Sequence, residues 1–283
     1  FSFKVKDSKG YSSTSEPIDI KFYSFNSEDY STLILTFDQE PNDVQIDLAP
    51  LKYNKDFAYS FTLDDGKYDA YAYAYPLLNG GEIDQLGENY PGLYYTDGID
   101  KQIPFRASVA WNSVNSSFFD IHNNTPDYIT WPQLQELITA KWAVLNHSYS
   151  HAAYGDTDYD FQISENRNRV LEKTAYAMDH FVIPSGDLNY VDPAIANNSE
   201  AIYSNKIEFQ GYRNGIDIDA PFNTEQLKIY RRYMYDDIYN PSNIMEKIDE
   251  IASMSTNGNH IWWHDFTHRI IPTQTGGSLV WET

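Results

Sequence analysis

From about residue 51 onward, short apolar segments alternate with segments that have the spacing of amphipathic helices. Parallel strands need a crossover connection, usually a helix, so this alternation predicts an α/β fold with a mainly parallel sheet. About seven strands are expected, enough to curl into a distorted parallel (β/α) barrel. Strand candidates lie at 57–63, 103–111, 142–146, 181–184, 207–212, 227–233 and 261–263. Helix candidates lie at 131–140, 164–178, 192–203 and 241–254.

The first fifty residues have a different pattern. Apolar and polar residues alternate there in short runs, at 1–5, 18–22, 33–37 and 44–48. Such alternation is typical of half-buried β-strands. We therefore predict a β-rich segment at 1–50, part of a β-sandwich being one candidate architecture, and a barrel domain at 51–283. The closing helix of such a barrel has no predicted counterpart after residue 264.

The charge of the chain restricts its partners. The formal net charge is -21, which disfavours binding to nucleic acid or anionic membrane surfaces. No apolar run is long enough for a membrane-spanning helix. With no cysteine, a metal ion would be held by histidine and carboxylate groups. Neutral partners such as sugars fit this composition, and 24 Tyr and 6 Trp supply flat rings, most of them expected in the core.

Polar residues capable of chemistry follow the predicted strands. They are Asp64 and Asp65, His147, Gly186 and Asp187, Arg213, and His264. Parallel α/β barrels place their active sites at the carboxyl ends of the strands. The glycine- and tyrosine-rich segment 79–102 is expected to be a loop at this rim.

Two of these groups together predict a metal site. Asp64 and Asp65 are adjacent like charges before Gly66, a pattern that a cation would stabilise but that is also common in surface turns. His147 and His151 are four residues apart, a spacing that places them on the same side of a helical turn, although such pairs also occur by accident. Two histidines and one carboxylate form an open metal site with room for water.

The motifs Thr62-Leu-Asp-Asp-Gly66 and His147-Ser-Tyr-Ser-His151 resemble those of the polysaccharide deacetylase family. The resemblance covers about residues 51 to 270, with Leu63 in place of the usual aromatic residue. It implies that Asp64 is the catalytic base and Asp65 a metal ligand. It also implies that His147 and His151 are the other two ligands, and that Ser148 steadies the loop.

Two later segments are also compared with motifs of this family. Ile261-Trp-Trp-His264 resembles the last motif, so His264 is the expected acid, although His260, His264 and His268 could alternatively form a second metal site. In the third motif Val182 replaces an arginine that holds the catalytic Asp. We predict that Arg213 supplies this cation, with a surface salt bridge as the alternative.

The expected acid-tuning aspartate remains open among three residues. They are Asp217, Asp219 and Asp236.

The resemblance implies a metal-dependent hydrolase that removes acetyl groups from an acetylated amino sugar polymer or oligosaccharide. The expected cofactor is one divalent metal ion, Zn²⁺, with Co²⁺ or Ni²⁺ as alternatives. An esterase acting on O-acetyl xylan is one alternative function, and a non-catalytic carbohydrate-binding protein on a degenerate deacetylase scaffold is another. A bacterial, exported protein is expected; the chain itself shows no signal peptide, and the sequon at Asn146 would place a glycan beside His147 in a eukaryote.

Overall fold

The computed structural model describes residues 57–84, 86–96, 101–206, 228–234 and 262–271 with their side chains, and for the rest only short strands and isolated positions. The chain divides into two compact units, Phe1–Lys55 and Asp56–Thr283. In the first unit β1 (Phe3–Lys6) pairs antiparallel with β4 (Gln45–Leu48), and β2 (Lys21–Ser24) pairs antiparallel with β3 (Ser31–Ile34).

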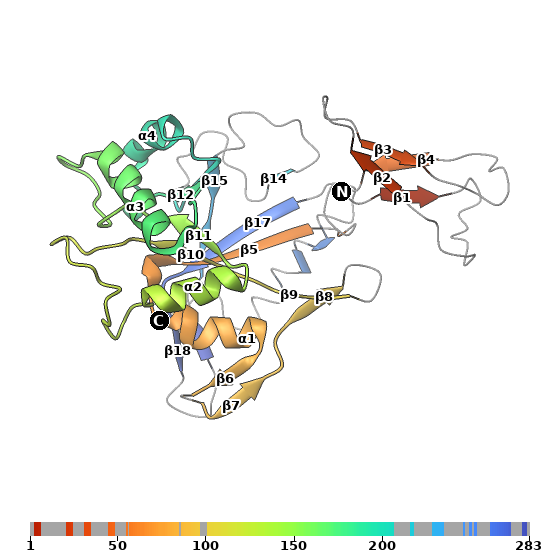
Figure 1. The fold of residues 1–283 in the computed structure, drawn as a ribbon, viewed down its shortest axis with the longest axis horizontal. Coiled ribbons are helices and arrows are strands. Elements are labelled where there is room, and N and C mark those ends of the chain that lie inside the picture. The colour runs from red at the N-terminus through yellow and green to blue at the C-terminus, as the bar shows by residue number, and fades with distance from the viewer. Residues whose placement is uncertain are drawn as a thin grey trace. The chain divides into compact units, whose positions relative to one another are not determined.

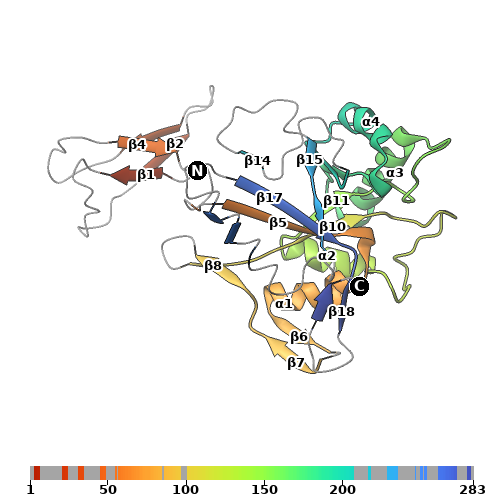
Figure 2. The same cartoon turned by 180° about the vertical axis from the view of Figure 1, so that it is seen from behind.

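The second unit is an α/β fold in which eight parallel strands form a nearly closed barrel, as the alternating pattern predicts. The strand order, with β16 pairing with β17, is β17 (Ile261–Thr267), β5 (Phe57–Leu63), β10 (Ser108–Trp111), β11 (Ala143–Asn146), β12 (His180–Val182), β13 (Ala201–Ser204), β15 (Lys228–Tyr230) and β16 (Arg232–Tyr233). Figure 2 shows β5 and β17 side by side, paired over seven positions from Phe57↔Ile261 to Leu63↔Thr267. A short strand, β14 (Ile216–Asp217), pairs antiparallel with β17.

Arg231 lies where the barrel closes onto β17. Before it, β15 pairs with β13; after it, β16 pairs with β17. The Arg231 backbone N–H donates to the Ser204 carbonyl, while the Met234 N–H donates to the Phe266 carbonyl. Because one segment changes partner at Arg231, the predicted strand 227–233 appears as two strands. Together with β13, which lies in a segment predicted as helix, this gives a barrel of eight strands rather than about seven.

Helices lie on the outside of the strands (Figure 1). α2 (Trp131–Thr139) begins at a capping box, in which Thr130 and Gln133 exchange side-chain to backbone hydrogen bonds. α3 (Tyr159–Thr174) begins five residues earlier than predicted because Asp158 caps it, and it ends at Ala175, whose backbone is left-handed. α1 (Tyr75–Asn79) and α4 (Val191–Ala196) are short.

Two sequence predictions in this unit are wrong. The predicted helix 192–203 stops at Ala196, and Ala201–Ser204 is the buried strand β13, because a short fully buried run gives no periodicity that separates strand from helix. The predicted loop 79–102 contains the paired strands β6 (Gly81–Ile83) and β7 (Glu88–Tyr90), and then β8 (Tyr94–Thr96), which pairs with β9 (Gln102–Pro104).

The strand predicted at 103–111 is also split, into β9 and β10. After β17, β18 (Ile270–Pro272) and β19 (Leu279–Trp281) form an antiparallel pair. Residues 207–212 and most of 241–254 lie outside the described part. No helix in the described residues is long and apolar enough to cross a membrane.

The core has two layers. Outside the barrel, Leu63, Val109 and Val144 from three neighbouring strands pack with Leu134 and Leu137 of α2. A second cluster contains residues from β10, β11, β12, β13 and β15, among them Ala110, Leu145, Val182, Tyr203 and Ile229. Because successive side chains of a strand point to opposite faces, these two sets fix which residues face the helices and which face the barrel interior.

Candidate active site

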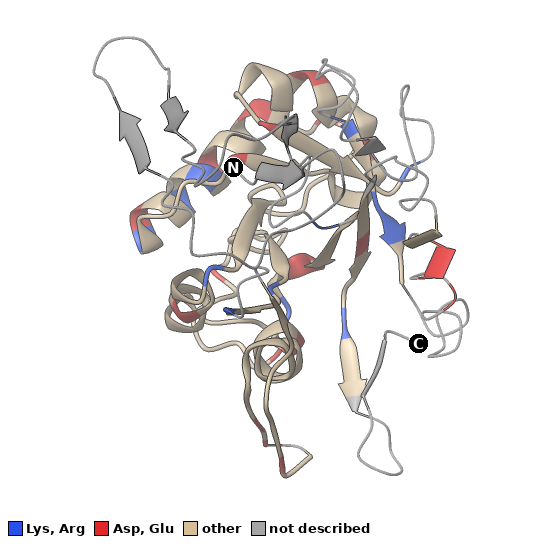
Figure 3. Cartoon of the chain, turned by 90° about the vertical axis from the view of Figure 1, so that its right-hand side faces the viewer, with Lys and Arg blue, Asp and Glu red and all other residues tan. Residues whose placement is uncertain are grey.

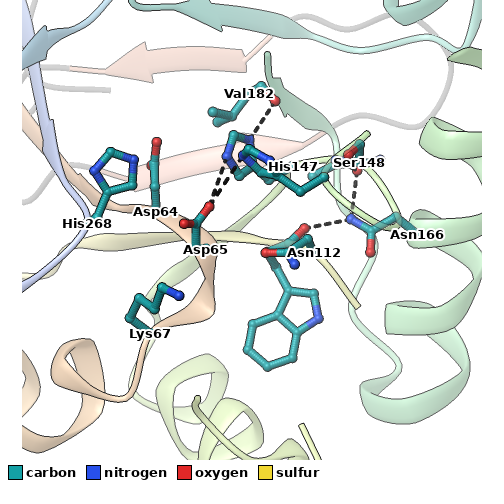
Figure 4. A network of polar contacts seen from close by, with 12 residues as sticks. Asp64, Asp65, Lys67, Asn112, His147, Ser148, Asn166, Val182 and His268 are labelled. Atoms are coloured by element: carbon teal, nitrogen blue, oxygen red, sulfur yellow. Dashed lines mark hydrogen bonds and ion pairs between the residues drawn. The ribbon is translucent and has the colours of Figure 1, made fainter. Parts of the chain in front are cut away.

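Asp65, His147 and His151 come together at the carboxyl ends of β5 and β11, with their ligand atoms all within 4.8 Å of one another. Asp65 Oδ1 lies 3.5 Å from Nε2 of His147 and 3.5 Å from Nε2 of His151. Figure 4 shows these side chains converging on Asp65. Among the described residues this is the group of histidine and acidic side chains that could hold a metal ion.

The spacing fits a bound ion better than it fits direct hydrogen bonds. Asp65 Oδ1 is buried and has no hydrogen-bond partner, which is costly for a carboxylate oxygen. Ligand atoms about 2.1 Å from a tetrahedral Zn²⁺ lie about 3.4 Å apart, close to the separations found here. The donor set, two imidazoles and one carboxylate, is also one that zinc accepts.

The protein sets the tautomer of His147. The Nδ1–H of His147 donates to the Val182 carbonyl oxygen at 2.9 Å, which leaves the lone pair of Nε2 directed toward Asp65. A metal-ligating histidine typically donates its other ring N–H to such an acceptor. Val182 therefore contributes to the site through its backbone.

The pKa values of Asp65 and His151 reflect their burial and their proximity to charged groups. Burial raises the pKa of Asp65, but the nearby His147, His151 and His268 lower it by more, so that the net pKa lies below the usual value. For His151, burial and the neighbouring His147 lower the pKa to about 4. A neutral imidazole is the form that can bind a metal.

The turn that carries Asp64 and Asp65 has an unusual backbone. Asp65 has φ of 66° and Gly66 has φ of 57°, both left-handed. Such a conformation is uncommon for a residue other than glycine and tends to occur at functional sites. Gly66 is also enclosed, since a Cβ there would lie 3.0 Å from Cε1 of His122 and 3.1 Å from Trp111. Gly66 therefore permits the turn, as expected from the sequence.

The segment with the two histidines is a loop and not the helical turn predicted from their spacing. Ser148 has φ of 63° and His151 has φ of 55°. These left-handed residues fold the chain back, so that the two imidazole centroids lie 4.7 Å apart. The pairing of His147 and His151 therefore comes from a strained loop.

A buried asparagine on α3 supports this loop. The Nδ2 atom of Asn166 donates to Oδ1 of Asn146 and to the Trp111 carbonyl, and its Oδ1 accepts from Ser113. Asn146 Oδ1 in turn accepts the Ser148 backbone N–H at 3.0 Å. Ser148 thus takes part in the support of the loop through its backbone.

Asp64 is held by Arg231. The two guanidinium nitrogens Nη1 and Nη2 donate to Oδ1 and Oδ2 of Asp64, each at 2.7 Å, and both side chains are almost fully buried. The guanidinium also lies over the Phe266 ring, 4.2 Å from its centroid. Such a two-point contact restrains both the position and the plane of the carboxylate.

Solved structures with a similar fold include a deacetylase from Streptococcus pyogenes in complex with acetate (TM-score 0.44, 13% identity, 66% of this chain and 68% of that chain). They also include a polysaccharide deacetylase from Bacillus cereus (TM-score 0.38, 14% identity, 60% and 45%) and a family 4 carbohydrate esterase from Streptomyces lividans (TM-score 0.36, 16% identity, 80% and 98%). No protein-family model and no curated protein matches the sequence.

The cation that contacts Asp64 comes from the junction of β15 and β16. Arg213, which the sequence offered as the missing cation, lies outside the described residues. The guanidinium that contacts Asp64 in the structure belongs to Arg231. Sequence analysis missed it because a charged residue inside a predicted strand is normally solvent-exposed, and only the bend between β15 and β16 turns it inward.

The last barrel strand, β17, is longer than the sequence predicted. His264 lies three residues before the end of β17, opposite Ser60, and is buried. Its Nε2 is 2.6 Å from the Thr62 hydroxyl, and its ring packs against Tyr203. The prediction placed the strand end at His264, but β17 continues to Thr267, so His264 belongs to the barrel interior and not to the rim.

His268 occupies the position expected of His264. Thr267 pairs with Leu63, so the residues that follow, His268 and Asp64, leave neighbouring strands at the same level. Figure 4 shows His268 on the other side of Asp64 from His147. The Nδ1 atom of His268 lies 3.2 Å from the Tyr233 hydroxyl. His268 is also close enough to influence the pKa of Asp65 and of His151.

Asn112, directly after β10, is a further polar residue at this rim that sequence analysis missed. Its Nδ2 donates to the Val114 carbonyl, which orients Oδ1, and Oδ1 is buried without a partner. An unpaired buried acceptor is unfavourable, so Asn112 is a candidate to accept a hydrogen bond from a bound ligand. The side chains of the candidate tuning residues Asp217, Asp219 and Asp236 lie outside the described part.

Proposed function

We propose that this protein is a metal-dependent hydrolase that removes acetyl groups from an acetylated sugar polymer or oligosaccharide. The observation that carries the proposal is the Asp65, His147 and His151 cluster beside a buried carboxylate, Asp64, held by an arginine. A structural metal site would not require the second carboxylate or the arginine. Hydrolysis requires both a metal site and a base beside it.

In this proposal Asp65, His147 and His151 hold one divalent ion, with Zn²⁺ preferred and Co²⁺ or Ni²⁺ as alternatives. The ion supplies Lewis acidity, which lowers the pKa of water and polarises a carbonyl group. Access is from the side of His151 and Asp65, whose side chains are 34% and 24% exposed, whereas that of His147 is 3% exposed.

Two residues of the chain then carry out the two proton transfers, one as a base and one as an acid. Asp64 accepts a proton from the attacking water as general base, while Arg231 holds its carboxylate in place. His268 is proposed as the acid that protonates the leaving amine or alcohol, since imidazole gains and loses protons near neutral pH. This replaces the role that the sequence assigned to His264. The Oδ1 of Asn112, which is buried without a partner, is proposed to accept a hydrogen bond from the substrate.

Both N-acetyl and O-acetyl groups suit this chemistry, because each presents an acetyl carbonyl with a leaving group that gains a proton. The net charge of -21 favours a neutral or cationic glycan over an anionic one. Figure 3 shows Asp and Glu residues on several elements of the described part. We propose in addition that the protein is bacterial and exported, since polymeric acetylated glycans lie outside the cytoplasm.

The test is acetate release from acetylated glucosamine oligomers, peptidoglycan fragments and acetylated xylan fragments, measured before and after treatment with a chelator. We expect release from at least one of these substrates, loss after chelation, and recovery with added Zn²⁺, Co²⁺ or Ni²⁺. Metal-loaded protein that binds glycans but releases no acetate would favour the non-catalytic carbohydrate-binding alternative. Activity that is unchanged after complete metal removal would exclude the proposed mechanism.

A further inference from the structure

A turn after β10 displays two phenylalanines. Asn115 closes it: its Oδ1 accepts the backbone N–H groups of Ser117 and Phe119 at 2.9 and 3.0 Å, and its own N–H donates to the Phe119 carbonyl. Phe118 has a left-handed backbone with φ of 61°, which is unfavourable for a bulky residue. The turn is thus a well-bonded structure that holds a strained conformation.

This turn exposes two large apolar rings. Phe118 is 58% exposed and Phe119 is 70% exposed. Neither the strained backbone nor the exposed rings stabilise the fold, because apolar rings gain free energy by leaving water. Adjacent exposed aromatic rings on a rigid turn are characteristic of a binding surface.

Further aromatic rings lie next to Phe118. The Phe118 ring lies 6.0 Å from that of Tyr149, which lies 5.8 Å from that of Phe161 in the first turn of α3. Tyr149 stands between the two metal-binding histidines in the sequence, and its carbonyl accepts the Val114 N–H. We call Phe118, Phe119, Tyr149 and Phe161 the aromatic row. Figure 1 shows that the loops after β10 and β11 leave the barrel on the same side.

We propose that the aromatic row binds sugar rings of an acetylated glycan chain whose reacting residue lies at the metal cluster. The proposal rests on the proposed function and adds which surface binds the sugar rings beyond the reacting one. The apolar C–H faces of pyranose rings pack on aromatic rings, and Tyr149 of the row lies between His147 and His151 in the sequence. The strong negative charge of the protein disfavours an anionic polymer or an anionic membrane on this surface.

The test compares the unaltered protein with the double variant Phe118→Ser/Phe119→Ser. The matched control is Phe105→Ser. Phe105 is 45% exposed, but it precedes β10, whereas the aromatic row follows the carboxyl ends of β10 and β11. The probes are glucosamine and xylose oligomers of one to six acetylated rings, together with the small ester 4-nitrophenyl acetate. Binding is measured by calorimetry on the metal-loaded protein, and acetate release is measured in parallel.

We expect the affinity of the unaltered protein to rise with chain length for one series of oligomers. The affinity of the double variant for the longer chains should be about tenfold lower. Hydrolysis of 4-nitrophenyl acetate and metal content should stay unchanged in both variants, and Phe105→Ser should retain the length dependence. Length-dependent binding that is lost in the double variant supports the aromatic row even if no acetate is released, in which case only the proposed function fails.

Three outcomes would overturn the inference. The first is an equal length dependence in the double variant. The second is no binding of either series by the unaltered protein. The third is a dimer of the unaltered protein that the double variant abolishes in size-exclusion chromatography, because the row would then contact a second copy of the chain.

Discussion

Arg231 illustrates how much one residue contributes at this site. It is almost fully buried, and it forms the two-point contact with Asp64. Removing one partner of a buried ion pair leaves the other without compensation and typically costs about 3 to 5 kcal/mol. We therefore predict that Arg231→Met destabilises the protein by an amount of this order and lowers acetate release by about a hundredfold or more, a loss typical of a displaced general base.

Urea unfolding and steady-state kinetics measure these two effects. Arg213→Met is the matched control, since Arg213 is the residue that the sequence alone nominated. The double variant Asp64→Asn/Arg231→Met should be less destabilised than the sum of the single variants, because the two side chains interact directly. Additive single effects, or a larger loss of activity in Arg213→Met, would contradict the pairing.

Gly66 allows a second prediction at the level of one residue. Gly66 and Gly87 have similar left-handed backbones, with φ of 57° and 65°, but a Cβ would meet His122 and Trp111 at Gly66 and nothing within 4 Å at Gly87. An alanine at either position pays the backbone penalty of about 1 kcal/mol. Gly66→Ala should therefore be the more destabilising in urea unfolding, and it alone should weaken metal binding, because the turn also carries Asp65. Equal effects of the two changes would show that the enclosure of Gly66 is unimportant.

At the level of elements, the length of β17 decides which histidine reaches the rim. We predict that His268→Gln lowers turnover of an N-acetyl substrate by about a hundredfold or more, the usual contribution of general acid catalysis. The loss should be much smaller for 4-nitrophenyl acetate, whose leaving group needs no proton. His264→Gln should instead lower stability, since His264 is buried against Thr62 and Tyr203. A similar loss for both substrates in His268→Gln would argue against proton donation.

Asp120 connects the loop after β10 to two helices. It accepts hydrogen bonds from the Trp131 indole of α2, from Arg169 of α3 and from the His122 backbone N–H. Burial raises the pKa of Asp120, but these contacts lower it by more, so that the net pKa lies below the usual value. A carboxyl group with a lowered folded-state pKa stabilises the protein above its unfolded pKa of about 3.9, and this contribution falls as the pH drops below that value.

Asp120→Asn should accordingly lower the free energy of unfolding at pH 7 by about 1 to 3 kcal/mol, the usual range for hydrogen bonds to charged groups. The difference from the unaltered protein should shrink as the pH falls below about 4. Urea unfolding over this pH range measures both effects. The control is Asp156→Asn, at an exposed position. A difference that stays constant down to pH 2 would mean that the Asp120 charge contributes nothing.

At the level of the whole molecule, a metal ion would couple the ends of β5 and β11. An ion that binds only the folded barrel stabilises it by mass action, by about 2.7 kcal/mol at a concentration 100 times the dissociation constant. We predict that Zn²⁺ raises the Tm of the full chain, that a chelator reverses the rise, and that His147→Ala and His151→Ala reduce both the rise and the metal content. Full metal content in both variants would disprove the ligand assignment.

Two groups of site residues could be predicted without the structure, because in each group the residues lie close together in the sequence after a strand. The turn Asp64-Asp65-Gly66 and the pair His147 and His151 each follow an apolar run that forms a strand in the structure, so their meeting follows from the parallel arrangement alone. Alternating strands and helices likewise predicted the barrel.

Three features depended on the tertiary structure. Arg231 reaches Asp64 because a strand changes partner at that residue, which is decided by packing between distant segments and leaves no local pattern. His268 replaces His264 at the rim because β17 continues for three residues, and strand ends are set by pairing with β5 rather than by composition. The histidine pair lies in a strained loop rather than a helix, since contacts from Asn146 and Asn166 hold backbone conformations that the residues themselves do not favour.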